Sequence, residues 1–162
     1  MNGGIVGAVR RNHALEHGTV SILLAKLGPD VRLAGRAVAD GFYIYGKIPT
    51  DAITSSAREA LLRLKAGEAG LAVTPLCGTN IAVAGVLTGL ASMMALGSSR
   101  RRFERLPTVF TAAMFGVLAS QPIGRLVQKH ITTSPDLDRA EITGVHSTAR
   151  GFVHKVETSF DA

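Results

Sequence analysis

The sequence has few cysteines and few aromatic residues, and both shortages narrow the range of functions. It contains one cysteine, Cys77, and no tryptophan, and aromatic residues make up only 5% of the chain. A single cysteine cannot form an intrachain disulfide, so cysteine usage indicates no redox compartment. The net charge is +6. Because basic segments interleaved with aromatic residues are missing, we expect no nucleic-acid partner despite that charge. We also expect no signal peptide, since residues 1–11 lack an apolar run followed by a cleavage site.

Charged residues are absent from two long stretches in the second half of the chain. Residues 80–97 and residues 108–123 contain no Asp, Glu, Lys or Arg. Each stretch approaches the length of roughly 20 residues that crosses the ~30 Å hydrocarbon layer of a bilayer. Either stretch alone is also compatible with a buried helix of a soluble core. Together they predict a hairpin of two transmembrane helices over residues 80–127, and hence an integral membrane protein.

Basic residues gather between the two apolar stretches. The cluster consists of Arg100, Arg101, Arg102 and Arg105. Clusters of this kind beside a membrane helix bind anionic head groups, so we expect membrane lipids to be partners of these arginines. The positive-inside tendency places the arginine loop in the cytoplasm. The missing signal peptide and the free thiol instead favour a cytoplasmic position for the rest of the chain, which leaves the orientation open.

Small residues recur at four-residue steps in both apolar stretches. They are Gly85 and Gly89 in the first, and Ala112, Gly116, Ser120 and Gly124 in the second. Rows of small residues allow membrane helices to approach closely. They predict close packing within the hairpin, and they also offer faces for a second copy of the chain or for another membrane protein.

The remaining sequence predicts a small α/β lobe around this hairpin. Apolar residues recur at helical spacing over residues 5–27 and again after Pro49, up to Gly67. Short β-prone runs surround Asp40-Gly41, and residues 141–160 predict a second β-hairpin. We therefore predict an α+β fold in which a small mixed sheet and two amphipathic helices are interrupted by the transmembrane hairpin. The predicted parts are residues 1–79 (lobe), 80–127 (membrane hairpin) and 128–162 (hairpin completing the lobe).

The first predicted helix carries the motif His-x-x-Glu-His, formed by His13, Glu16 and His17. Histidines four residues apart on a helix project in the same direction and can bind one metal ion, while the glutamate can reach a water on that metal. These residues lie on the apolar face, where unpaired polar groups are costly to bury. They predict a zinc or other divalent metal site with Glu16 as general base. The alternative is a histidine pair that is satisfied by Glu16 and backbone carbonyls.

A metal site of this kind needs a third protein ligand, and Cys77 is the best candidate. It comes just before the first apolar stretch, where Thr79 or Asn80 can cap the following helix. A thiol at a helix N-terminus has a lowered pKa, which favours the thiolate that zinc binds. Cys77 could instead be a buried apolar residue, or a nucleophile that uses His13 or His17 as its base. Other candidate ligands are His130, Asp136, Asp138, His146 and His154.

Three segments resemble a known family when taken together. They are residues 12–19 (NHALEHGT), 41–46 (GFYIYG) and 77–80 (CGTN). They resemble a bacterial membrane family that is described only as a domain of unknown function. They are also distantly similar to predicted metal-dependent membrane enzymes, which share His-x-x-Glu-His and a later His-Pro-x-Cys-Gly-Thr stretch. The resemblance implies metal ligands at His13, His17 and Cys77 and a general base at Glu16. It also implies a protein of the bacterial inner membrane.

The sequence departs from those enzymes at Thr74, which stands where they carry histidine before the proline. If that histidine binds metal in the relatives, one ligand is missing here. The sequence therefore supports two hypotheses. The first is an integral-membrane zinc-dependent hydrolase, with peptides as one substrate class. The second is a non-catalytic accessory or interaction protein, in which the same residues form a structural metal site or a hydrogen-bond cluster.

Overall fold

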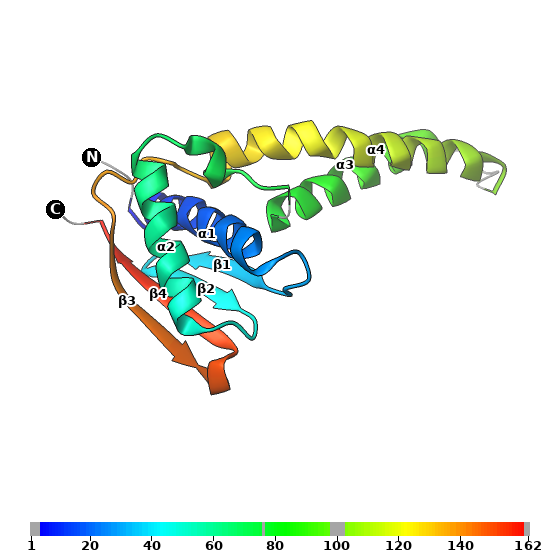
Figure 1. Cartoon of the computed structure of the whole chain (residues 1–162). Helices are drawn as coiled ribbons and strands as arrows, with labels where there is room; N and C mark the ends of the chain where they lie inside the picture. Colours follow the sequence, from blue (N-terminus) through cyan, green and yellow to red (C-terminus); the bar gives the residue numbers. More distant parts are fainter. Residues whose placement is uncertain (1–3, 76, 98–102, 161–162) are drawn as a thin grey trace. The chain divides into compact units, whose positions relative to one another are not determined.

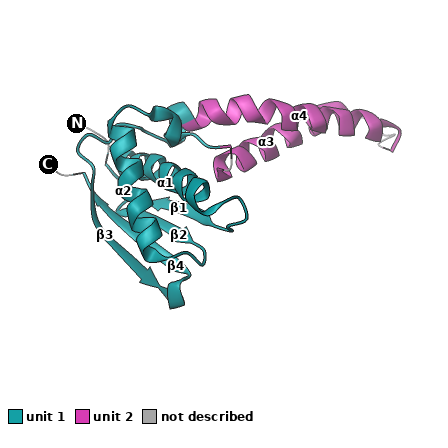
Figure 2. Ribbon diagram, in the orientation of Figure 1, with its two compact units in different colours: residues 1–74, 129–162 teal, residues 75–128 magenta. Residues whose placement is uncertain are grey.

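The computed structural model describes residues 4–75, 77–97 and 103–160. These residues form two compact units, one made of residues 1–74 and 129–162 and the other of residues 75–128 (Figure 2). Of the four arginines expected to contact lipid head groups, Arg100, Arg101 and Arg102 lie outside the described residues.

The first unit combines two helices with a four-stranded sheet (Figure 1). Its elements are α1 (Ile5–Leu27), β1 (Ala34–Val38), β2 (Gly41–Tyr45), α2 (Thr50–Lys65), the 3₁₀ turn η1 (Ala69–Ala72), β3 (Glu141–Thr148), the 3₁₀ turn η4 (Ala149–Gly151) and β4 (Val153–Ser159). The strand order is β1-β2-β4-β3, so the N-terminal and C-terminal hairpins share one sheet. The predicted α+β class is confirmed.

The sheet is antiparallel throughout its described strands, and the prediction of a mixed sheet was wrong in this respect. Both hairpins join consecutive strands by short turns, which forces antiparallel pairing within each hairpin. The hairpins then meet through β2 and β4, which also run in opposite directions. No crossover connection of the kind that parallel strands require is present among these strands.

Both helices of this unit pack on one face of the sheet. Phe42 and Ile44 on β2 and Val156 on β4 point to that face and are completely buried. Helix α1 contacts β1 and β2, and α2 contacts β3 and β4. The buried stripe of α2 includes Ile53, Ala57, Ala60 and Leu64. The core of the unit is therefore a single layer of side chains between two helices and a sheet.

Helix α1 is more deeply buried than an amphipathic surface helix. Between Asn12 and Val20 all residues except His13 are buried, on every side of the helix. The reason is that α1 packs against α2, β1, β2 and η1 at once. The prediction of an amphipathic helix holds for α2 and underestimated the burial of α1. The His-x-x-Glu-His motif consequently lies at the centre of this unit.

The second unit is a pair of long apolar helices, α3 (Gly78–Leu96) and α4 (Leu106–Val127), which pack together. A short 3₁₀ turn, η2 (Phe103–Arg105), precedes α4, and a π-helical turn, η3 (Gln128–Thr132), continues it into the first unit. Only 6% of the most apolar window of α3, and 11% of that in residues 103–132, is buried. Both helices are long and apolar enough, by length and composition, to cross a membrane.

The small residues of α4 form its contact with α3. A Cβ atom added at Gly116 would lie 2.8 Å from the Cα of Thr88 on α3, so only glycine permits this approach. Ser120 and Gly124 continue the buried row. The prediction of close packing is confirmed for this row. It was wrong for Gly85 and Gly89, whose added Cβ atoms would meet no described atom within 4 Å and which therefore face away from α4.

Candidate metal site

His13, Glu16 and His17 occupy one side of α1, as the motif predicts. The imidazole rings of His13 and His17 lie one turn apart, with centroids separated by 4.3 Å and ring planes inclined by 62°. His17 and Glu16 are almost completely buried, and the side chain of His13 is 20% exposed. The pair is therefore closed toward the core and open to solvent only on the side of His13.

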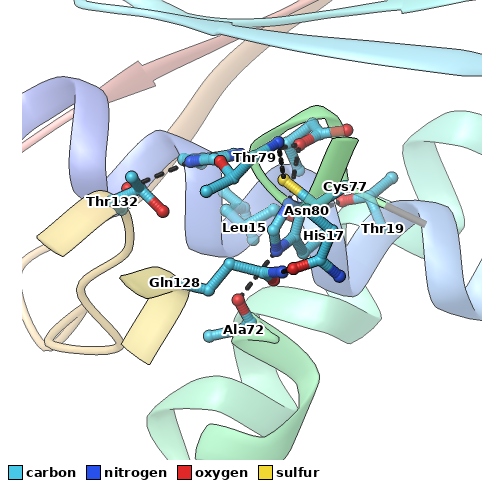
Figure 3. A network of polar contacts seen from close by, with 11 residues as sticks. Leu15, His17, Thr19, Ala72, Cys77, Thr79, Asn80, Gln128 and Thr132 are labelled. Carbon is cyan, nitrogen blue, oxygen red and sulfur yellow. Dashed lines mark hydrogen bonds and ion pairs between the residues drawn. The ribbon is translucent and has the colours of Figure 1, made fainter. Parts of the chain in front are cut away.

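Backbone carbonyls fix the orientation of both imidazoles. The Nδ1 atom of His17 lies 2.8 Å from the carbonyl oxygen of Ala72 in η1 (Figure 3), and Nδ1 of His13 lies 3.0 Å from the carbonyl oxygen of Thr132. A carbonyl oxygen only accepts, so each Nδ1 carries the proton and donates it. In the neutral form each Nε2 atom then presents a lone pair. This is the tautomer of a histidine that binds metal through Nε2 while its other nitrogen is held by an outer partner.

The Glu16 carboxylate lies beside both Nε2 atoms. Its Oε2 atom is 4.0 Å from Nε2 of His13 and 3.7 Å from Nε2 of His17. These distances exceed those of hydrogen bonds. Two nitrogen lone pairs and a carboxylate oxygen thus converge on one small region with a spacing that suits a shared cation. A divalent metal ion placed there could accept electron pairs from these donors.

Gly35 on β1 makes room for the Glu16 carboxylate. A Cβ atom built on Gly35 would lie only 1.6 Å from Oε1 of Glu16 and 2.4 Å from its carboxylate carbon. No side chain larger than hydrogen is therefore compatible with the observed position of Glu16. This role of Gly35 could not be predicted from the sequence, because a glycine in a short strand carries no local sign of its contact with a helix.

Polar contacts anchor the surroundings of the motif within the same unit. The guanidinium group of Arg10 donates to the carbonyl oxygens of His130 and Thr133, which hold the turn whose Thr132 carbonyl orients His13. The completely buried side chain of Asn12 donates to the carbonyl oxygens of Val38 at 2.9 Å and Ala39 at 3.2 Å, at the end of β1. It accepts a hydrogen bond from Oγ1 of Thr158 at 2.6 Å. These contacts keep the motif-bearing turns of α1 in place.

Cys77 is the N-cap residue of α3. Its sulfur accepts a hydrogen bond from the backbone N–H of Thr79 at 3.3 Å (Figure 3), and the residue is only 6% exposed. The prediction that Thr79 or Asn80 caps the helix was wrong, because the thiol itself takes the capping position. A hydrogen bond from a free N–H of the first turn, together with the helix N-terminus, stabilises a thiolate.

His13, His17 and Cys77 form a possible metal site. One ligand atom of each residue lies within 4.8 Å of those of the other two. The other candidate ligands, which are His130, Asp136, Asp138, His146 and His154, do not join this group.

Two of those other histidines have different surroundings. His154 on β4 is completely buried, and its Nε2 donates to the carbonyl of Gly151 at 3.1 Å. His146 on β3 is exposed and lies 3.5 Å from a carboxylate oxygen of Glu157. Thr74, at the position where the similar enzymes carry histidine, is buried, with 8% of its surface exposed.

The donor set of His13, His17 and Cys77, two imidazoles and one thiol, suits zinc.

Comparison with known proteins shows the family of this chain. Residues 8–145 match the model of a family described as a domain of unknown function, DUF6391. The chain is also 36% identical, over 141 residues, to an uncharacterized protein of the cyanobacterium Picosynechococcus sp., a match that covers 82% of this chain and 69% of the relative. No solved structure matches. With its His-x-x-Glu-His helix, its buried thiol and its pair of apolar helices, the chain belongs to the DUF6391 family.

Proposed function

We propose that this protein is an integral-membrane, zinc-dependent hydrolase in which His13, His17 and Cys77 bind the metal and Glu16 is the general base. The observation that carries the proposal is the convergence of two Nε2 atoms, whose tautomers are fixed by carbonyls, on the Glu16 carboxylate. Three protein ligands leave one position of a tetrahedral zinc ion open, as in catalytic zinc sites.

The chemistry follows from the position of Glu16 next to the ligands. A zinc ion at this site would supply Lewis acidity, which lowers the pKa of a water molecule toward neutrality. Glu16 accepts the proton that the attacking water loses. For an amide substrate, the water oxygen adds to the acyl carbon, the C–N bond breaks, and Glu16 returns the proton to the leaving nitrogen. Peptides are the substrate class that this motif favours.

The two apolar helices support a membrane location for this chemistry. Helix α3 begins directly after Cys77, so the third ligand lies at the end of a segment that can cross a bilayer. A membrane-associated substrate fits such a position. The basic loop formed by Arg100, Arg101, Arg102 and Arg105 would bind anionic head groups. In the described part of that loop, Arg105 donates to the carbonyl of Ala95 at 3.3 Å.

A non-catalytic role is the second candidate, and the depth of the site favours it. Glu16, His17 and Cys77 are only 6%, 2% and 6% exposed, which leaves little of their surface for a substrate to contact. Structural zinc sites are closed by four protein ligands, whereas catalytic sites keep one position for water. In the non-catalytic reading the protein is an accessory subunit, and the exposed apolar helix faces bind a second copy or another membrane protein.

The metal content of the full-length protein in detergent tests the proposal. We expect about one zinc per chain in the wild type and in Glu16→Gln, and loss of zinc in His17→Ala. His146→Ala is the matched control, since it removes an exposed histidine outside the site and should leave the zinc in place. Absence of metal from the wild type after zinc is supplied would overturn the proposal.

A substrate screen then separates the two candidates. Peptide or amide hydrolysis by the wild type, lost in Glu16→Gln while zinc is retained, is the result expected of an enzyme. A zinc-loaded wild type with four protein ligands and no hydrolysis would establish the non-catalytic role instead. Glu16→Gln keeps the size of the side chain and removes only its capacity to accept a proton.

A further inference from the structure

Two buried side-chain amides, those of Asn80 and Gln128, lie at the end of the helix pair at which α3 begins and α4 ends. Cys77, the N-cap residue of α3, is at the same end. Asn80 on α3 is 4% exposed, and Gln128, which follows α4, is completely buried. The Nε2 atom of Gln128 donates to Oδ1 of Asn80 at 2.8 Å (Figure 3). Removing one of two hydrogen-bonded, buried amides is costly, because the remaining amide loses that hydrogen bond without regaining one to water.

Asn80 in turn holds the chain on both sides of Cys77. Its side-chain Nδ2 donates to the carbonyl of Pro75 at 3.0 Å, and its backbone N–H donates to the carbonyl of Cys77 at 2.9 Å. These two hydrogen bonds tie Pro75 and Cys77 to the first turn of α3, where the sulfur lies at the helix N-terminus. The position of the thiol is set by the side chain of Asn80 as well as by the helix.

Gly124 on α4 is the third part of this arrangement. A Cβ atom at Gly124 would lie 2.0 Å from Oδ1 of Asn80, so the amide of Asn80 occupies the space that a side chain at Gly124 would fill. Gly124 and Gln128 are four residues apart and continue the buried row of Gly116 and Ser120 along α4. The row of α4 residues that packs against α3 therefore ends at Gln128, whose amide donates to Asn80.

We infer that Asn80 and Gln128 are positioning residues for the Cys77 thiolate and couple the metal site to closure of the α3–α4 hairpin. This inference rests on the proposed function of Cys77 as a metal ligand. When α4 packs against α3, Gln128 orients Asn80, and Asn80 holds the turn that aims the sulfur. Separation of the two helices at this end releases Asn80 and, with it, the thiol.

The test uses the full-length protein in detergent and two readouts. Gln128→Met keeps the length of the side chain but removes the donor, Asn80→Ala removes the whole amide, and Ser120→Ala alters the same helix contact without touching the pair. Cobalt(II) reports metal affinity and, through its sulfur-to-metal charge-transfer band, ligation by the thiolate. The reaction rate of Cys77 with a maleimide in metal-free protein reports the position of the thiol without any metal. That rate is unambiguous because Cys77 is the only cysteine in the sequence.

We expect Gln128→Met and Asn80→Ala to weaken cobalt binding by about 10- to 100-fold, the usual effect of losing an outer partner of a ligand. Their charge-transfer band should weaken and Cys77 should react faster, whereas Ser120→Ala should behave as the wild type. Equal thiol reactivity in the wild type, Gln128→Met and Ser120→Ala would overturn the positioning role. A wild type that binds no cobalt would overturn the proposed function, and the thiol rates would still decide the positioning role.

Discussion

The carboxylate of Glu16 lies against the backbone of Gly35, and this contact makes a strand residue part of the candidate site. The added Cβ would lie 1.6 Å from Oε1 of Glu16, and the other close atoms are also those of the Glu16 side chain. The conflict is therefore with one side chain and not with the backbone of α1. Gly35 restricts where Glu16 can lie, and Glu16 is the residue proposed to move a proton.

We predict that Gly35→Ala destabilises the wild type by about 1–3 kcal/mol, the usual cost of overpacking a buried site. In the Glu16→Ala background the same substitution should cost little, because the clashing carboxylate is gone. Thermal unfolding of metal-free protein in a double-mutant cycle measures this coupling. Equal destabilisation in both backgrounds would show that Gly35 does not act through Glu16.

Residue spacing predicted the polar side chains of α1 in the candidate site, but it did not predict the groups from other elements that position them. His13, Glu16 and His17 were predicted because helical periodicity alone places them on one side of α1. Gly35 and the Ala72 and Thr132 carbonyls were not, because they reach the motif only through tertiary packing. Gln128 is the next four-residue step after Gly116, Ser120 and Gly124, but it is not a small residue, so a pattern of small residues ends at Gly124.

At the scale of elements, α3 and α4 use only one of the two rows of small residues for their contact. Gly116 lies against the backbone of Thr88, whereas Gly85 and Gly89 face away from α4. The sequence predicted that both rows pack the hairpin, because spacing shows which residues share a face but not which face meets the partner helix. The sheet shows the same limit of local spacing, because the two hairpins were predicted but the antiparallel pairing of β2 with β4 that joins them was not.

We predict opposite effects for alanine at two of these glycines. Gly116→Ala should lower the stability of the helix pair by about 1–3 kcal/mol, because the added methyl group meets the backbone of α3. Gly85→Ala should leave stability unchanged or raise it slightly, since alanine favours a helix over glycine and meets nothing there. Unfolding midpoints in detergent compare the two, and equal midpoints would contradict the observed contact.

A second prediction at this scale concerns the β1–β2 turn, where Asp40 accepts a hydrogen bond from Lys155 of β4. That hydrogen bond holds the pKa of the Asp40 carboxyl below its ordinary value. Its stabilising contribution is therefore complete above the ordinary value of about 4 and is lost as the pH falls through the lowered pKa. Because the Asp40 side chain is 68% exposed, solvent screening limits this contribution to less than about 1 kcal/mol.

We expect Asp40→Asn to lower the unfolding midpoint slightly at pH 7 and to have no effect in strong acid, where the wild-type carboxyl is protonated as well. Thermal unfolding across this pH range measures the difference. Asp30→Asn, at an exposed position outside the sheet, serves as control. A difference that persists unchanged in strong acid would show that the Asp40 charge is not its cause.

At the scale of the whole molecule, a small α+β unit and a pair of long apolar helices are built from one continuous chain. The chain passes between the two units at Thr74–Pro75 and again at Gln128–Lys129. We predict that the protein stays in the membrane fraction after alkaline carbonate washing. Release into the supernatant would contradict a transmembrane role of α3 and α4.

X-ray absorption at the zinc K-edge of the zinc-loaded, full-length protein addresses the metal site itself. We predict two nitrogen ligands at about 2.0 Å, one sulfur at about 2.3 Å and one further oxygen, as a three-ligand site with an open position requires. Cys77→Ser should remove the sulfur signal, and Glu16→Gln should leave the ligand set unchanged. A spectrum without sulfur, or a protein that takes up no zinc, would contradict the proposed site of His13, His17 and Cys77.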